Sequence, residues 1–313
     1  MEKILVSGCS GFVGSNLSAW FNQNNFEVFG LTRSQNLQPS FSSFTWENIS
    51  SIIELPVRTI IHLAGKAHDL KNISDDAAYF SINTGLTIKL FDLFLKSKAE
   101  TFIYFSSVKA VADKVDGILV EDVIPDPKTA YGRSKLMAEE YLLYQYLPEG
   151  KRLIILRPCM IHGPGNKGNF NLLYQFVSKG IPYPLAAFQN ERSFLCIDNL
   201  CFIVHQIIQD TTIPSGIYNV ADDEPLSTNA LVKTIAETMH RKPRLWAIPQ
   251  PFLRAIATIG DKIKLPLNSE RLNKLTENYV VSNDKIKTAL KIDHLPISAS
   301  DGLRTTIKSF RLV

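Results

Sequence analysis

A tyrosine and a lysine stand four residues apart in the sequence Tyr131-Gly132-Arg133-Ser134-Lys135. The segment from Ala130 to Tyr146 has helical spacing, so both side chains would lie on one face, one turn apart. A phenol with a pKa of about 10 is a poor acid–base catalyst at neutral pH, but a neighbouring ammonium group favours the phenolate. The pair therefore suits proton transfer at a substrate hydroxyl, although so short a pattern also arises by chance on exposed helices.

Ser107 offers a second hydroxyl, directly after the apolar segment Thr101 to Ser106. The segment is typical of a buried strand, and doubly wound sheets bind ligands at the carboxyl ends of their strands. Ser107 could polarise a carbonyl while Tyr131 exchanges the proton. The alternatives are a strand-end cap for Ser107 and an exposed helix pair for Tyr131 and Lys135.

A glycine-rich turn, Gly8-Cys9-Ser10-Gly11-Phe12-Val13-Gly14, follows the apolar strand Ile4 to Ser7 and opens the helical segment Phe12 to Asn24. Glycine lets backbone amides approach a pyrophosphate, and the start of a helix attracts negative charge. This context predicts a dinucleotide site rather than a merely flexible turn.

The second predicted strand ends in Gly30-Leu31-Thr32-Arg33-Ser34, without the carboxylate that usually holds the adenosine ribose of NAD. A guanidinium at Arg33 could instead bind a 2′-phosphate through charge-assisted hydrogen bonds. We therefore favour NADP(H), while NAD(H) remains open if Arg33 stacks on adenine or faces water.

The elements that position these residues alternate between strands and helices, which predicts an α/β fold with a doubly wound parallel sheet. A segment rich in Gly, Pro and Asn, from Gly163 to Pro184, interrupts the pattern. We expect a Rossmann-type domain over residues 1–163, a return of the chain to it around 195–220, and a smaller mixed substrate domain over 164–313. The predicted strands are Ile4 to Ser7, Glu27 to Thr32, Thr59 to Ala64, Thr101 to Ser106, Leu153 to Arg157 and Ile217 to Val220, and the helices include Phe12 to Asn24, Ala77 to Lys98, Ala130 to Tyr146 and Thr228 to His240, the last capped by Ser227.

Composition narrows the class of protein. A net charge of +4 on 313 residues, with both signs scattered, gives no sign of a nucleic-acid-binding arm. The four cysteines lack a metal-site pattern and are expected to be reduced structural thiols, with no metal bound. We expect a cytoplasmic protein without membrane insertion, in which the amphipathic stretch Pro249 to Lys264 forms a surface helix rather than an anchor.

Together these motifs resemble the extended short-chain dehydrogenase family, also called the NAD-dependent epimerase/dehydratase family. The resemblance runs from end to end and includes the G-x-x-G-x-x-G spacing of the glycine turn. Further matching segments are His62-Leu63-Ala64-Gly65, Asn83, Phe105-Ser106-Ser107, Arg157-Pro158 and Gly163-Pro164-Gly165. It implies an NAD(P)-dependent oxidoreductase in which Ser107 and Tyr131 hold the reacting hydroxyl or ketone and Lys135 grips the cofactor ribose.

The resemblance also implies a wider cofactor site, with the backbone of Leu63 to Gly65 along the nicotinamide ribose. The whole implied set is Gly8, Gly11, Phe12, Val13, Gly14, Thr32, Arg33, Asn48, Ile49, Leu63, Ala64, Gly65, Asn83, Tyr131, Lys135 and Pro158. The chain departs from the family in the residues that follow Ser107, which are expected to face the substrate. Relatives often carry an aromatic residue and a glycine there, but this chain reads Val108-Lys109-Ala110-Val111, so Lys109 could meet the substrate.

Within the family the chain resembles the nucleotide-sugar branch, in which Asn169 and Arg192 would hold the diphosphate or uridine of a UDP-sugar. Asp198 and Asn199 are expected to cap the following helix rather than touch a ligand. The resemblance points to bacterial surface-polysaccharide biosynthesis and to a homodimer. Arg33 favours a reductase of a UDP-4-keto-6-deoxy-N-acetylhexosamine. A UDP-hexose or UDP-N-acetylhexosamine 4-epimerase with tightly bound NAD is the alternative, and a non-catalytic dinucleotide sensor is a third. The sugar itself is not specified by one sequence.

Overall fold

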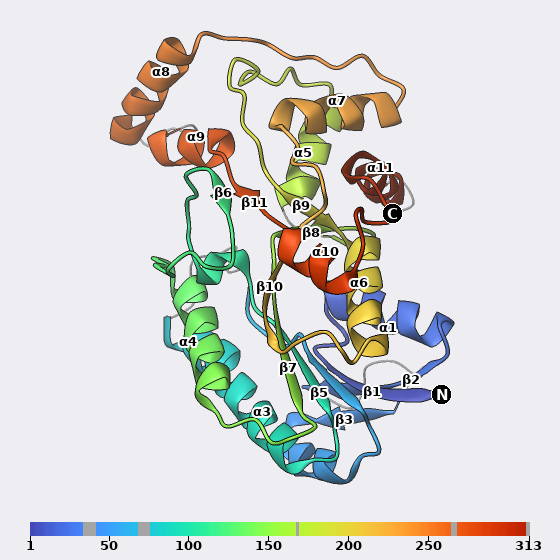
Figure 1. Ribbon diagram of the computed structural model, residues 1–313. Coiled ribbons are helices and arrows are strands. Elements are labelled where there is room, and N and C mark those ends of the chain that lie inside the picture. The colour runs from blue at the N-terminus through green and yellow to red at the C-terminus, as the bar shows by residue number, and fades with distance from the viewer. Residues whose placement is uncertain (34–41, 68–75, 167–168, 264–267, 311–313) are drawn as a thin grey trace.

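A seven-stranded parallel sheet organises the molecule in this computed structural model, which describes residues 1–313 except 34–41, 68–75, 167–168, 264–267 and 311–313 (Figure 1). Its strand order is β10-β7-β5-β4-β1-β2-β3. The strands are β1 (Glu2–Ser7), β2 (Phe26–Thr32), β3 (Ser43–Thr45), β4 (Thr59–His62), β5 (Thr101–Phe105), β7 (Arg152–Pro158) and β10 (Gly216–Val220). The strand order reverses beside β1, so the carboxyl ends of β1, β4 and β5 meet where such sheets bind ligands.

Helices cover both faces of the sheet, as Figure 1 shows. On one face α1 (Phe12–Gln23) and α6 (Ile197–Gln209) bury Leu17, Phe21 and Ile203 in one apolar core. On the other face α3 (Leu86–Lys96) and α4 (Ala130–Tyr144) bury a second core around Phe91 and Leu142. Because both faces are covered, the strands are almost continuously apolar, as fully buried parallel strands require.

Beyond the sheet lies a smaller region with its own apolar core and two short two-stranded sheets. The sheets pair β8 (Met160–His162) with β9 (Phe194–Cys196), and β6 (Ile118–Leu119) with β11 (Val280–Val281). The helices here are α5 (Asn169–Ser178), α7 (Thr228–Thr238), α8 (Gln250–Ile263), α9 (Ser269–Thr276), α10 (Asp284–Leu290) and α11 (Ala299–Ser309). Helix α8 packs on this region through Leu253 and Ala257, which are buried, while Phe252 and Ile259 are exposed.

The predicted fold class is confirmed, and the predicted strands agree with the observed ones within two residues at each end. The single helix predicted over Ala77 to Lys98 is wrong in detail. It is divided into α2 (Asp76–Tyr79), the π-helix η2 (Phe80–Gly85) and α3. The short strands β3, β6, β8 and β11 were missed because they are brief and lack a periodic pattern of their own.

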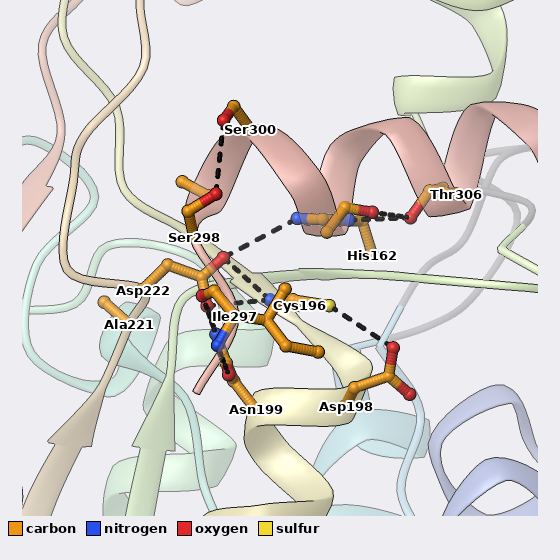
Figure 2. A network of polar contacts seen from close by, with 12 residues as sticks. His162, Cys196, Asp198, Asn199, Ala221, Asp222, Ile297, Ser298, Ser300 and Thr306 are labelled. Atoms are coloured by element: carbon orange, nitrogen blue, oxygen red, sulfur yellow. Dashed lines mark hydrogen bonds and ion pairs between the residues drawn. The ribbon is translucent and has the colours of Figure 1, made fainter. Parts of the chain in front are cut away.

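The start of α6 corrects a second prediction, since neither Asp198 nor Asn199 caps this helix (Figure 2). Its N-cap residue is Cys196, whose backbone N–H is bound 2.9 Å from Oδ2 of Asp222. Asn199 lies inside the helix and donates to Asp222 and to the Ile297 carbonyl, both at 2.8 Å. Asp222, which is distant in sequence and follows β10, thus holds the start of α6 through the N–H of the N-cap residue and the side chain of Asn199.

The four cysteines, Cys9, Cys159, Cys196 and Cys201, are all buried and unpaired. Burial raises the pKa of each thiol, so these groups stay protonated and behave as small apolar side chains. Among the described residues, no cluster of histidine, cysteine and carboxylate side chains could hold a metal ion. No helix in that part of the chain has the length and apolar character needed to cross a bilayer.

Candidate active site

The glycine turn between β1 and α1 has the geometry of a phosphate cradle. Gly8 has φ of 70°, and a Cβ there would lie 2.8 Å from the backbone nitrogen of Ala64, so only glycine fits. Gly11 is the N-cap of α1, with no side chain bonded to the helix amides and no carboxylate in the first turn. Phe12, Val13 and Gly14 therefore begin a helix whose positive end is available to a pyrophosphate.

The adenosine end of the predicted cofactor site lies along β2 and β3. Thr32, which is buried, ends β2 and pairs in register with Thr45, and the exposed Arg33 follows it. Asn48 has non-helical backbone angles inside η1 (Trp46–Glu54), and the neighbouring Ile49 is buried. Arg33 and Asn48 thus both follow strands at the same edge of the sheet.

A chain of hydrogen bonds fixes the backbone after β4. The Ser7 hydroxyl lies 2.6 Å from Nδ1 of His62 and accepts from the backbone amides of Leu63 and Ala64. Nε2 of His62 lies 2.8 Å from the hydroxyl of Thr87, which donates to the Asn83 carbonyl at 2.6 Å. Since the Thr87 proton is committed, His62 donates through Nε2 and accepts through Nδ1, which makes it neutral.

The electrostatics of His62 agree with that assignment. The ring is fully buried, and burial lowers its pKa to about 3, with a smaller contribution in the same direction from Lys135. Ser7 and Thr87 were missed by the sequence analysis. The only signal was the run His62-Leu63-Ala64-Gly65, because the partners of a buried histidine are not adjacent to it in sequence.

Asn83 connects the loop after β4 to α4. It is fully buried in η2, where its Oδ1 accepts from the Lys66 amide at 2.7 Å and its Nδ2 donates to the Lys66 carbonyl at 3.0 Å. Nδ2 also donates to Ser134 at 2.9 Å, and Ser134 donates to the Tyr131 carbonyl at 2.8 Å. The π-helical turn therefore aims an amide that joins the predicted ribose-lining loop to the helix bearing Tyr131.

The first turn of α4 lies very close to η3 (Val108–Ala110), the short helix after β5. A Cβ on Gly132 would lie 2.3 Å from the carbonyl oxygen of Lys109 and 2.8 Å from Pro127, so a larger residue would push the two elements apart. Thr129 caps α4 by accepting from the Gly132 amide at 3.2 Å. The glycine within Y-x-x-x-K, which the sequence analysis did not single out, thus brings Tyr131 close to Ser107.

Ser107 and Tyr131 meet at the carboxyl end of β5. Ser107 is the N-cap of η3, and its hydroxyl accepts from the Lys109 amide at 3.2 Å. Burial raises the pKa of Tyr131, while the neighbouring side chain of Ser107 acts in the opposite direction. The phenol form is therefore favoured here, and a phenolate would need an additional positive charge nearby.

Lys135 is one turn further along α4 and is only 5% exposed. Its ammonium group donates to the Phe105 carbonyl at 2.8 Å and lies 4.9 Å from the ring centre of Tyr104. Burial lowers its pKa to about 8, with Glu139 acting in the opposite direction. A Cβ on Gly65 would lie 3.3 Å from Nζ, so the cation borders the loop after β4. Lys135 thus lies between the end of β5 and the loop after β4 that is expected to line the nicotinamide ribose.

A buried ion pair holds α4 against the sheet. Arg157, on β7, donates to both carboxylate oxygens of Glu139, with distances between 2.6 and 3.2 Å. Neither side chain is more than 3% exposed. Pro158 follows Arg157 and is buried at the end of β7.

Lys109 extends towards the smaller region. Its ammonium group lies 4.0 Å from the ring centre of Tyr279 and donates to the Asp113 carbonyl at 2.8 Å. Burial lowers its pKa, against the effects of Asp113 and Glu277. The Tyr279 hydroxyl donates to the Ala112 carbonyl at 2.7 Å. Tyr279 was not identified from the sequence, since an isolated tyrosine carries no pattern.

Arg192 lies beside the same tyrosine. The two residues form a parallel backbone bridge, and the guanidinium donates to the Lys274 carbonyl at 3.1 Å and pairs with Glu277 at 3.4 Å. The structure therefore brings both Arg192 and Lys109 next to Tyr279. Asn169 is the first residue of α5, and the preceding Lys167 and Gly168 lie outside the described residues.

The model of the NAD-dependent epimerase/dehydratase family matches residues 4–221 of the chain. A UDP-glucose 4-epimerase of Vibrio cholerae is 31% identical over 99% of this chain and 95% of its own. An N-acetyl-alpha-D-glucosaminyl-diphospho-ditrans,octacis-undecaprenol 4-epimerase of Escherichia coli O157:H7 is 26% identical over 91% of this chain and 85% of its own.

Among solved structures, a UDP-glucuronic acid 4-epimerase from Bacillus cereus in complex with NAD superimposes with a TM-score of 0.76. The superposition covers 99% of this chain and 96% of that one, at 19% sequence identity. At that identity the likeness establishes the fold alone.

Proposed function

Because the chain belongs to the NAD-dependent epimerase/dehydratase family, and is an enzyme of the nucleotide-sugar epimerase and reductase type, we propose that it acts at carbon 4 of a UDP-sugar as a 4-epimerase. One observation carries the proposal: the side chains of Ser107 and Tyr131 are neighbours, one helical turn from the buried cation of Lys135. A hydroxyl that binds the reacting oxygen, a phenol that exchanges its proton and a nearby cation suit proton transfer coupled to hydride transfer.

In the proposed reaction Tyr131 accepts the proton of the substrate hydroxyl at carbon 4, and the hydroxyl of Ser107 donates a hydrogen bond to the same oxygen. A bound nicotinamide dinucleotide supplies the hydride acceptor and donor. Lys135 orients the ribose and, by its positive charge, opposes the effect of burial on Tyr131. Epimerisation then requires the 4-ketone to turn before hydride returns to its other face and Tyr131 gives the proton back.

The proposed binding residues divide into two groups. The turn from Gly8 to Gly14, the backbone of Leu63 to Gly65 and Asn83 hold the cofactor, with Arg33 and Asn48 at the adenosine end. Lys109, Asn169 and Arg192 hold the sugar nucleotide. Arg192 offers a planar fork of donors for a diphosphate, and a bound diphosphate would compete with Glu277 for it.

A reductase of a UDP-4-keto-6-deoxy-N-acetylhexosamine is the second candidate, and Arg33 favours it. This exposed cation stands where a carboxylate would bind the ribose of NAD. An enzyme of this kind consumes NADPH at each turnover, whereas an epimerase retains its dinucleotide. The two relatives described above are 4-epimerases, which supports epimerisation. In either case we place the reaction in bacterial surface-polysaccharide biosynthesis.

One experiment separates the two candidates. The purified protein is incubated with UDP-N-acetylglucosamine and NAD, and in parallel with a UDP-4-keto-6-deoxy sugar and NADPH. We expect a 4-epimer in the first reaction without net change in reduced nicotinamide absorbance. Loss of NADPH in the second reaction, with no epimer in the first, would establish the reductase instead. Inactivity in both would contradict the proposal.

A further inference from the structure

The outer face of α8 and the segment leading into it expose large apolar side chains. Trp246 is 58% exposed, Phe252 60% and Ile259 55%. Phe252, Ala255, Ile259 and Lys262 are spaced so that they form one stripe along the helix. The opposite side of the helix packs on the protein, because Leu253 and Ala257 are buried in the core. The outer stripe is therefore not needed to hold the domain together.

The same segment concentrates positive charge. Residues 241–262 contain five cations, Arg241, Lys242, Arg244, Arg254 and Lys262, and one carboxylate, Asp261, all of them exposed. Their net charge of +4 equals that of the whole chain, so positive and negative charges are equal in number in the rest of the chain. Asp261 is the single carboxylate of this segment, and its two oxygens accept from the backbone and hydroxyl of Ser269.

Figure 1 shows that this segment runs along one outer edge of the molecule, from the end of α7 to α8. Helix α9 packs beside α8 and carries the Lys274 carbonyl that accepts from Arg192. Leu275, on α9, is itself 46% exposed. The edge is thus separated from the predicted sugar-nucleotide residues by a single helix.

We infer that residues 241–262 form a docking face for an anionic phospholipid bilayer, which holds the enzyme at the membrane surface without spanning it. Exposed aromatic and aliphatic side chains flanked by lysine and arginine are what an interfacial helix requires. A second copy of the chain fits poorly, because a twofold contact through this face would bring +4 against +4. The inference uses neither the identity of the sugar nor the direction of the reaction.

The test is co-sedimentation of the full-length protein with vesicles. We expect binding to phosphatidylcholine vesicles containing about 30% phosphatidylglycerol, weak binding to phosphatidylcholine alone, and release as NaCl is raised from about 0.05 to about 0.5 M. Lys242→Glu with Lys262→Glu should weaken binding roughly tenfold or more, because each basic residue near an anionic surface contributes about 1 kcal/mol. Phe252→Ser with Ile259→Ser should weaken it at every salt concentration.

Matched variants outside residues 241–262 control for charge and hydrophobicity. Lys96→Glu with Lys98→Glu makes the same charge change at other exposed positions, and Ile118→Ser with Ile124→Ser removes exposed apolar groups elsewhere. Neither should alter binding, and all four double variants should keep the wild-type melting temperature and turnover on a soluble UDP-sugar.

Three results would overturn the inference. They are no sedimentation with anionic vesicles, equal loss in the control variants, and self-association that Phe252→Ser with Ile259→Ser abolishes. None of these depends on turnover, so failure of the docking face and failure of the proposed reaction are distinguishable.

Discussion

At the scale of single residues, the site combines groups whose charges are set by burial. Lys135 keeps its proton at neutral pH although burial lowers its pKa to about 8. Tyr131 is a phenol whose pKa is raised by burial, with Ser107 acting against that effect. His62 is neutral and bonds the Ser7 hydroxyl, which accepts from the backbone amides of Leu63 and Ala64. In the proposed reaction the proton is carried by Tyr131, and Ser107 and Lys135 position it.

Tyr131→Phe removes only the hydroxyl that exchanges the proton. We expect kcat to fall by roughly 10²- to 10⁴-fold, the usual contribution of a positioned acid–base group, with dinucleotide binding unchanged. Steady-state turnover and fluorescence titration of the dinucleotide check this. Tyr144→Phe, an exposed position on the same helix, is the control. Full turnover by Tyr131→Phe would instead support a non-catalytic sensor.

His62 predicts how stability responds to acid. Its pKa is about 3 in the folded protein and 6.5 in the unfolded chain, so between these values only the unfolded chain takes up the proton. Stability is therefore lost as pH falls from about 6.5 towards 3, by up to about 1.4 kcal/mol per pH unit from this group. Urea unfolding at several pH values should show that the free energy of unfolding falls less steeply with decreasing pH in His62→Gln than in the wild type. An unchanged slope, or the same reduction in the exposed-site variant His240→Gln, would exclude His62 as the cause.

At the scale of elements, the sequence indicates β1, β2, β4, β5 and β7 because buried strands are short, apolar and bounded by turns. It does not indicate the π-helical turn η2, since only the contacts of Asn83 with Lys66 and Ser134 require it. Asp198 and Asn199 resemble caps of α6, but the N-cap is Cys196, whose N–H donates to Asp222 from a distant segment. Local pattern therefore predicted the elements, whereas contacts between elements determined the details of the site.

Gly132 tests the close approach of α4 to η3. In Gly132→Ala the added methyl would meet the Lys109 carbonyl at 2.3 Å, so α4 must shift and separate Tyr131 from Ser107. We expect kcat to fall by roughly 100-fold, as displacements of about 1 Å at catalytic groups do. Turnover and thermal melting are compared with those of Gly85→Ala, whose new methyl would lie 3.8 Å from its nearest neighbour. Equal turnover in both variants would show that the close approach is not required.

At the scale of the whole molecule, the two halves contribute different parts of the proposed site. The sheet and its helices present the glycine turn, His62, Asn83 and the Tyr131 helix, while the smaller region presents Arg192 and Tyr279. This division follows from the connectivity of the parallel sheet, whose carboxyl edge the motifs already indicated. The meeting of Lys109, Tyr279 and Arg192 could not be predicted, since it depends on packing between residues more than 80 positions apart.

The exposed face of α4 bears on assembly. Met137, Leu143 and Tyr144 are 48%, 52% and 89% exposed, which is unusual for apolar residues so close together on one helix. We predict a homodimer through α3 and α4, so Leu143→Arg should shift the mass measured by light scattering from dimer to monomer. Ile124→Ser, at another exposed apolar position, should leave the mass unchanged. A monomeric wild-type protein would contradict the prediction.

The central claim, hydride and proton transfer at carbon 4 with Tyr131 as the proton carrier, is tested most directly with a UDP-hexose or UDP-N-acetylhexosamine deuterated at carbon 4. The protein, supplied with NAD, should convert it to the 4-epimer with deuterium retained at carbon 4 in the NMR spectrum, because the hydride leaves and returns within one site. Tyr131→Phe should abolish that conversion. An epimer that has exchanged its deuterium with solvent, or wild-type conversion by Tyr131→Phe, would contradict the account.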